Sequence, residues 1–256
     1  MLVKFDETLE RVTLPDGQEM VLMRWDGHIS IEVAGRSLMS SHDHGSEDDL
    51  GRIVAERLSG IARPRVLIGG LGLGFTLRAA LDALPPAAQV IVAELVPAVV
   101  RWNRGEHGAL AGRPLDDKRV EVKIEDVAKV IARRPTYDAI LLDVDNGPDA
   151  LTHAGNAGLY KRAGLGRAHA KLRAGGVLAV WSAFPSKTFT KWLESVGFDV
   201  ALKRSRSTLP GGPRYYIWLA QRPGAAKPGP AKPGTAKPGP AKVRRSRART
   251  SRAPRR

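Results

Sequence analysis

The 256-residue chain contains no cysteine. This absence excludes a disulfide framework, a thiolate nucleophile and a cysteine-ligated zinc site. The chain also lacks any apolar run near the roughly 20 residues that a membrane-spanning helix needs, and its first residues do not resemble a secretory signal. We therefore expect a cytoplasmic protein that has no membrane partner and binds no metal.

A glycine-rich loop follows a short apolar run. Val66–Ile68 is typical of a buried parallel strand, an amphipathic helical pattern begins at Phe75, and between them lie Gly70, Gly72 and Gly74. Strand, glycine loop and helix open a nucleotide-binding βαβ unit, in which glycines allow a tight turn and a close approach of the backbone to a ligand. The loop lacks the Gly-Lys-Ser/Thr ending of an NTP-binding loop, and its G-x-G-x-G spacing is tighter than the dinucleotide pattern.

Acidic residues end the next two predicted strands. Glu94 lies 20 residues beyond Gly74, about where a carboxylate must lie to accept hydrogen bonds from a ribose diol. Glu125 and Asp126 follow the third strand, where a carboxylate can accept a hydrogen bond from the exocyclic amine of adenine. Two plainer interpretations stay open, namely a surface position for Glu94 and a solvated helix N-terminus for the other two acids.

A fourth apolar strand, residues 137–142, ends in Asp143, and Asp145 follows two residues later. Because ligands of open α/β sheets bind outside the carboxyl ends of the strands, we expect Asp143 to lie beside Gly70. Two such carboxylates can face one substrate amine, where they hold its cation or accept its proton. The sequence therefore predicts both aspartates as catalytic, while a turn role for Asp145 before Gly147 stays open.

The order of these motifs resembles the spermidine synthase-like aminopropyltransferases, a subgroup within the class I S-adenosylmethionine-dependent methyltransferase fold. Their glycine loop reads approximately I-G-G-G-D-G-G-T-L-R, against residues 68–78 here, and their fourth strand reads Y-D-x-I-I-x-D-S-S-D-P-x-G-P, against residues 137–148. The resemblance covers roughly residues 10–220. It implies transfer of an aminopropyl group from decarboxylated S-adenosylmethionine to a small amine, no tightly bound cofactor, and a homodimer like those that family members often form.

The chain departs from the family pattern at three places. Leu71, Gly72 and Leu73 stand where the family loop has its aspartate, and the double-serine turn is shortened to residues 144–146. Trp181 follows the fifth strand, where the family usually has a Gln. These differences leave a second function open, a methyltransferase that uses intact S-adenosylmethionine and an unknown acceptor.

The residue types also predict how the chain is organised. Asp-Gly pairs at 16–17 and 26–27 are hairpin signals, so residues 1–45 are expected to form a small β-meander. Residues 46–222 are expected to form a Rossmann-like, doubly wound α/β domain with a seven-stranded sheet, in which five parallel strands are completed by a C-terminal antiparallel hairpin. Residues 223–256 form a separate basic tail.

An acidic segment, residues 41–49, joins the meander to the first helix of the larger domain. Ser46 and Asp49 have the spacing of a capping box, which predicts that the helix begins there. The segment is interpreted either as a solvated loop or as an attractor for a cationic substrate. The family has a Tyr-His-Glu run at this junction that contributes to its substrate pocket, and the resemblance offers His44 or Glu47 as a substitute.

The tail has a composition of its own. Residues 223–256 contain four Lys, seven Arg and no acid, which is +11 of the formal net charge of +15. Its Pro- and Gly-rich repeats, with a period of five, predict disorder, because no large apolar residue follows Val243. Such a tail either binds nucleic acid without sequence preference or only adds solubility. A third function is therefore a non-catalytic, nucleoid-associated protein that binds nucleic acid through residues 223–256.

Overall fold

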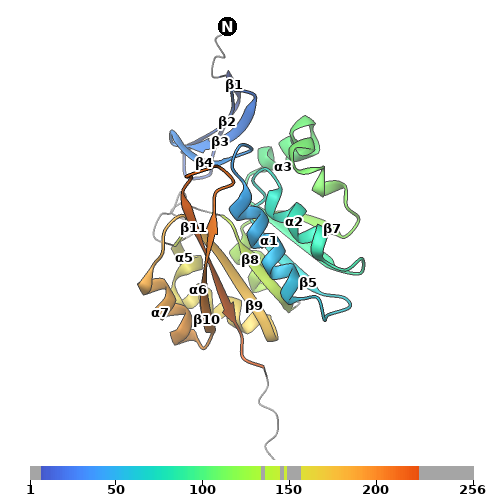
Figure 1. Ribbon diagram of the computed structural model, residues 1–256, viewed down its shortest axis with the longest axis vertical. Coiled ribbons are helices and arrows are strands. Elements are labelled where there is room, and N and C mark those ends of the chain that lie inside the picture. The colour runs from blue at the N-terminus through green and yellow to red at the C-terminus, as the bar shows by residue number, and fades with distance from the viewer. Residues whose placement is uncertain (1–6, 134–135, 145–146, 149–156, 225–256) are drawn as a thin grey trace, which may run out of the picture. The chain divides into compact units, whose positions relative to one another are not determined.

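Figure 1 shows the computed structural model, which describes residues 7–133, 136–144, 147–148 and 157–224. The predicted catalytic residue Asp145 and almost all of the basic tail lie outside the described residues. The two sheets belong to one compact unit, Met1–Ala225. The predicted domain boundaries at residues 45 and 222 stay predictions.

Four antiparallel strands form a small N-terminal sheet in the order β1-β2-β3-β4. The two-residue turns at Asp26–Gly27 and Ala34–Gly35 have positive φ at both positions. Turns of this kind match the twist of the strands that they join. The predicted β-meander is therefore confirmed. Its strands are β1 (Glu7–Thr13), β2 (Glu19–Trp25), β3 (His28–Val33) and β4 (Arg36–Ser40).

A seven-stranded sheet forms the rest of the framework, in the order β10-β11-β9-β8-β5-β6-β7. The five strands from β9 to β7 are parallel, and β10 and β11 are antiparallel, as predicted. The chain order reverses between β5 and β8, which is where open α/β sheets bind ligands. The strands are β5 (Arg65–Gly69), β6 (Gln89–Glu94), β7 (Val120–Ile124), β8 (Tyr137–Leu142), β9 (Leu172–Ser182), β10 (Asp199–Arg206) and β11 (Arg214–Gln221).

Helices cover both faces of this sheet. Alternate side chains of a strand point to opposite faces, so Val66 and Ile68 pack into one hydrophobic cluster and Leu67 into the other. The first cluster lies under α1 to α3 and also takes in the small sheet, while the second lies under α4, α6 and α7. The helices are α1 (Gly45–Arg57), α2 (Phe75–Ala83), α3 (Pro97–Arg104), α4 (Val127–Ala132), α5 (Ala157–Tyr160), α6 (Arg162–Lys171) and α7 (Lys187–Val196), with 3-10 helices at Glu106–Ala111 and Pro114–Asp116.

The predicted capping box at Ser46 is wrong. Helix α1 begins at Gly45, so Ser46 lies inside it and its hydroxyl donates to the Glu47 carboxylate at 2.5 Å. Gly45 packs so closely against Thr208 that a Cβ there would lie 2.6 Å from the Thr208 methyl group. This contact with a distant segment explains why a local spacing pattern misplaced the start of the helix.

No helix in the described part of the chain is long and apolar enough to cross a membrane. Across the same residues, no group of three or more His, Asp or Glu side chains is arranged to hold a metal ion.

Candidate functional site

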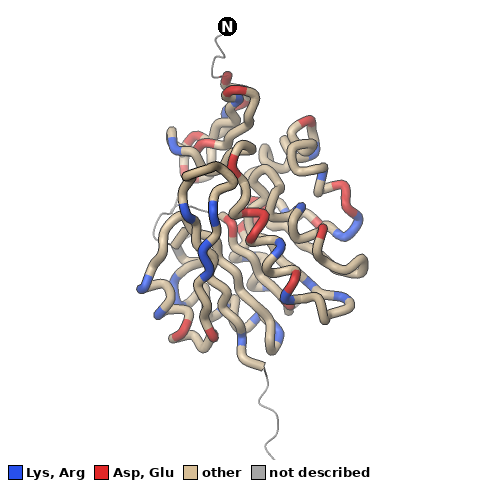
Figure 2. The backbone as a smooth tube through the Cα atoms, in the orientation of Figure 1, with Lys and Arg blue, Asp and Glu red and all other residues tan. Residues whose placement is uncertain are grey.

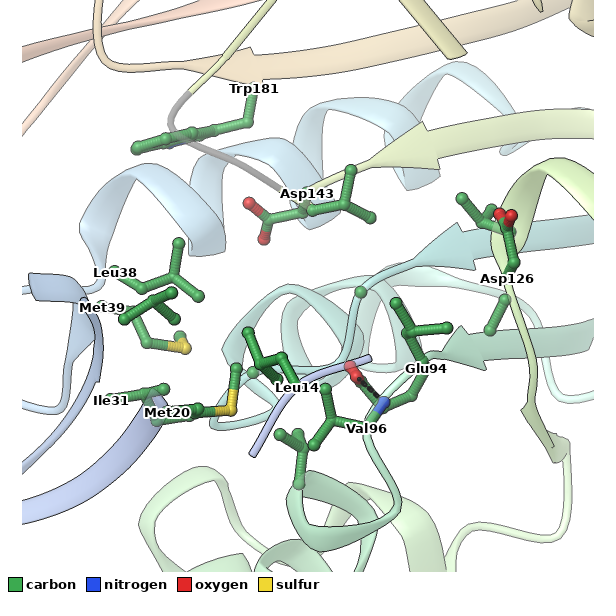
Figure 3. A pocket seen from close by; sticks show the side chains of 18 of the residues that line it. Leu14, Met20, Ile31, Leu38, Met39, Glu94, Val96, Asp126, Asp143 and Trp181 are labelled. Carbon is green, nitrogen blue, oxygen red and sulfur yellow. Dashed lines mark hydrogen bonds between the residues drawn. The ribbon is translucent and has the colours of Figure 1, made fainter. Parts of the chain in front are cut away.

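A pocket lies where the carboxyl ends of β5, β6 and β8 meet the small sheet (Figure 3). It encloses about 1030 Å³ of empty space, counting the open solvent at its mouth. The small sheet and its first turn supply an apolar wall made of Leu14, Met20, Ile31, Val33, Leu38 and Met39. The large sheet and α1 supply four carboxylates, Glu47, Glu94, Asp126 and Asp143. The pocket is therefore apolar on one side and acidic on the other.

The glycine loop runs along the floor of the pocket, and the fold itself requires two of its glycines. Gly70 has φ +85°, and a Cβ there would overlap the backbone oxygen of Asp143. Gly72 has φ +52°, and a Cβ there would overlap the sulfur of Met39. Gly74 does not line the pocket. It is the N-cap of α2, with φ +91°, and it lies beside the Asn103 side chain. Contacts within the protein thus explain part of a pattern that the sequence assigned to a tight turn and to the approach of a ligand.

Replacing Gly70 with Ala is expected to destabilise the fold by about 2–5 kcal/mol, because positive φ and steric overlap act together. Gly17→Ala is a matched control, since Gly17 has the same φ of +85° but nothing lies within 4 Å of its Cβ position. Urea unfolding of the two variants measures the difference. Equal losses of stability would mean that the loop can move away from β8.

Glu94 is the last residue of β6, and its side chain is buried on the pocket wall. Its Oε2 accepts a hydrogen bond from the backbone N–H of Leu71 at 2.9 Å, and its Oε1 accepts one from Val96 at 2.8 Å. Burial raises the pKa of Glu94, while these backbone donors act to lower it. The backbone N–H groups of Leu95 and Gly72 also act on this carboxylate. Glu94 therefore holds the glycine loop, and its contact with a ribose stays a prediction.

The two acids after β7 have different positions. Asp126 lines the pocket, and its Oδ1 also accepts the Ala128 N–H at 2.7 Å as the N-cap of α4. Glu125 is not among the lining residues, and its carboxylate pairs with Arg133 at 2.6 Å. A capping role is therefore established for Asp126, and its predicted contact with adenine uses the acceptor capacity that remains. The geometry gives Glu125 no part in the pocket.

Asp143 follows β8 at the switch point, next to Gly70 as predicted. Its Oδ2 accepts a hydrogen bond from the Thr76 hydroxyl at 2.7 Å. Thr76 is the second residue of α2, and its hydroxyl also lies 3.3 Å from the backbone oxygen of Glu47. The Glu47 side chain lines the same pocket and is 7% exposed. Thr76 therefore links α1 to the end of β8 and connects the buried Glu47 to the partly buried Asp143.

The protonation of these two acids is coupled. Burial raises the pKa of Asp143 to about 6, although the Thr76 hydroxyl acts to lower it. Burial, together with the negative charge on Asp143, raises the pKa of Glu47 to about 8. Near pH 7 the pair therefore holds about one proton between its two carboxyl groups. A pair of acids whose pKa values are driven apart by their surroundings is typical of a proton-transfer site.

Aromatic and acidic groups from other elements lie close by. Trp181 at the end of β9 lines the pocket, and its ring lies 5.3 Å from that of Tyr215 on β11. The Tyr215 hydroxyl donates to Asp43 at 3.4 Å. Burial raises the pKa of Tyr215 to about 12, and the charges of Asp43 and Glu47 add to this effect. The tyrosine therefore stays neutral beside a concentration of negative charge.

Several residues that shape the site carry no local sequence signal. The Met39 sulfur accepts the Leu73 backbone N–H at 3.0 Å, and the Asn103 side chain donates to the Gly72 backbone oxygen at 2.8 Å. Both contacts join the glycine loop to segments that are distant in the chain. For Glu47 the sequence offered two signals, the acidic segment at 41–49 and the family resemblance, which left the choice between His44 and Glu47 open.

No protein-family model matches the chain, and no curated protein matches it by sequence. Solved structures do match it. One is the spermidine synthase from Thermotoga maritima, with 18% sequence identity and a TM-score of 0.68. Another is a spermidine synthase in complex with the transition-state analogue AdoDATO, with 17% identity and a TM-score of 0.64. Each match covers 84% of this chain and 72% of the other. The chain therefore has the fold that the motif resemblance predicted.

Proposed function

We propose that the protein is an aminopropyltransferase that uses decarboxylated S-adenosylmethionine and a small amine acceptor. The observation that carries this proposal is the charge of the pocket. Four carboxylates are among its lining residues, and none of the described lining residues is Lys, Arg or His. Such a pocket favours cations, because burial strengthens electrostatic interactions with any ligand that enters. The likeness to the spermidine synthase fold supports the same choice.

The charges of the two cosubstrates distinguish aminopropyl from methyl transfer. Decarboxylated S-adenosylmethionine carries a sulfonium and an ammonium, while the intact molecule adds a carboxylate. A carboxylate near Glu47 and Asp143 would be repelled, and the described lining residues include no cation that could hold it. Glu47 also supplies an acid in a site whose glycine loop has lost the aspartate of the family pattern.

The proposed reaction is a substitution at the aminopropyl carbon next to sulfur. The lone pair of the acceptor nitrogen forms the new N–C bond, the C–S bond breaks, and its electron pair stays on sulfur, which leaves as the neutral thioether of methylthioadenosine. The acceptor nitrogen must first lose a proton to free this lone pair, and Asp143, whose pKa is raised less than that of Glu47, is the carboxylate that can accept it. Positioning the neutral amine in line with the carbon that the sulfonium activates supplies most of the acceleration.

Calorimetric titration of the full-length protein with both cosubstrates tests the proposal. We expect decarboxylated S-adenosylmethionine to bind at least tenfold more tightly, a difference of about 1.4 kcal/mol. Preference for intact S-adenosylmethionine would instead indicate a methyltransferase. If neither ligand bound at millimolar concentration, the proposal would be wrong and the non-catalytic alternative would take its place.

A further inference from the structure

Positive charge is distributed unevenly along the chain, well beyond the basic tail. Residues 157–222 hold 12 Lys and Arg against only two acids, whereas residues 1–156 hold 18 against 24. No acid follows Asp199. The second half of the folded unit is therefore strongly basic before the tail begins.

Three arginines of this region share one face of the C-terminal hairpin. Ser205 on β10 points toward α1, where its hydroxyl donates to Asp49 at 2.6 Å. Because side chains alternate along a strand, Arg204 and Arg206 point to the opposite face. Arg214 on β11 is the direct cross-strand partner of Arg206, so it lies on that face as well. Figure 2 shows that Lys and Arg residues are frequent along the hairpin of β10 and β11.

Helix α7 extends the basic face. The helix packs on this side of the hairpin, where the indole N–H of Trp218 donates to the Thr190 hydroxyl at 2.9 Å. Lys187 and Lys191 are exposed and lie one turn apart on the helix. Phe184 lies just before the helix and is 62% exposed. We call Arg204, Arg206, Arg214, Lys187 and Lys191 the basic face.

None of these five cations forms an ion pair with any described residue, although Arg11, Arg24, Arg52 and Arg119 elsewhere in the fold do. Like charges placed directly opposite each other across two strands, as Arg206 and Arg214 are, destabilise a hairpin. Repulsion between these arginines therefore destabilises the hairpin, and an anionic ligand bound at this surface would offset that repulsion.

We propose that the basic face of the folded unit binds the phosphate backbone of a nucleic acid. This inference goes beyond the proposed transferase activity and does not depend on it. Arginine donates paired hydrogen bonds to phosphate oxygens, and an exposed aromatic ring beside cations can stack on an unpaired base. An anionic membrane is the less suitable partner, because residues 223–256 contain only one large apolar residue, Val243, and so offer nothing to insert into a bilayer.

Full-length protein carrying Arg204→Gln, Arg206→Gln and Arg214→Gln tests this surface. Its control is Arg36→Gln, Arg63→Gln and Arg104→Gln, which removes the same charge from exposed arginines outside the face that likewise form no ion pair with the described residues. We expect the first triple variant to weaken binding of a single-stranded oligonucleotide by about tenfold or more, and the control by less than about twofold.

The salt dependence gives a second measure. Loss of three phosphate contacts should reduce the slope of log K against log salt by about 2 for a single strand and by nearly 3 for a duplex of the same length. Equal effects of the two triple variants would show that net charge and the tail alone bind nucleic acid, and would overturn the proposal. Tighter binding to phosphatidylserine vesicles than to either oligonucleotide would also overturn it. Transferase activity is measured separately and is expected to be unchanged in both variants.

Discussion

Asp143→Asn is expected to lower kcat by about 10²- to 10⁴-fold and to leave the binding of methylthioadenosine nearly unchanged. In the proposed mechanism, the substitution removes the group that accepts the proton of the attacking amine. An Asn oxygen at this position can still accept the Thr76 hydrogen bond that orients the side chain. Steady-state kinetics and calorimetry with the nucleoside separate the two effects.

The pH profile gives a sharper form of the same prediction. Because burial raises the pKa of Asp143 to about 6, kcat/KM of the unmodified protein should increase as the pH rises through that value. The variant should lack this increase. Asp116→Asn, a change of the same kind at an exposed acid, should behave like the unmodified protein. Loss of nucleoside binding in Asp143→Asn would mean that Asp143 holds the cosubstrate and does not transfer the proton.

The fold could be predicted from the sequence because its determinants are local or periodic. Buried parallel strands appear as short apolar runs, and Asp-Gly pairs locate two hairpins of the small sheet. A carboxylate at the end of a parallel strand must lie at the ligand-binding edge of the sheet, so Glu94, Asp126 and Asp143 could be placed in one pocket before any coordinates were known.

The other half of the site could not be predicted in this way. Met39 contacts the glycine loop only because the small sheet packs over it, and no property of the sequence around Met39 specifies that contact. Glu47 becomes buried because α1 packs tightly on α2, where a Cβ on Gly51 would overlap the backbone of Thr76. For Glu125 the prediction was wrong in the opposite way. Its position after β7 predicted a contact with the ligand, but in the folded protein its carboxylate pairs with Arg133.

Because Glu47 is buried in the folded protein, the stability of the fold depends on pH. A carboxyl group whose pKa is higher in the folded state than in the unfolded chain contributes stability below its unfolded pKa and loses it as the pH rises through the folded pKa. For Glu47 the stability is therefore lost between the unfolded pKa of about 4.5 and the folded pKa of about 8. We therefore expect the stability of the free protein to fall by about 2–4 kcal/mol between pH 5 and pH 9.

Glu47→Gln should remove the part of this dependence that comes from Glu47, because a neutral amide has no proton to lose and its oxygen can still accept the Ser46 hydroxyl. Urea unfolding at pH 5 and pH 9 measures the change. Glu56→Gln is the control on the same helix, since Glu56 is exposed and pairs with Arg52 at 2.9 Å. A Glu47→Gln variant that lost as much stability at pH 9 as the unmodified protein would show that Glu47 is already ionised in the folded state.

Rising pH, which lowers the stability of the free protein through Glu47, should instead strengthen the binding of the cosubstrate. A dicationic cosubstrate favours the ionised form of Glu47, so binding near pH 7 should release protons, and its affinity should rise between pH 6 and pH 8. Calorimetry in buffers with different ionisation enthalpies counts the protons released. In Glu47→Gln the affinity at pH 8 should fall by about tenfold or more, and the proton release should shrink to the share that comes from Asp143. Unchanged affinity and unchanged proton release in that variant would assign both effects to Asp143 alone and leave Glu47 with a purely structural role.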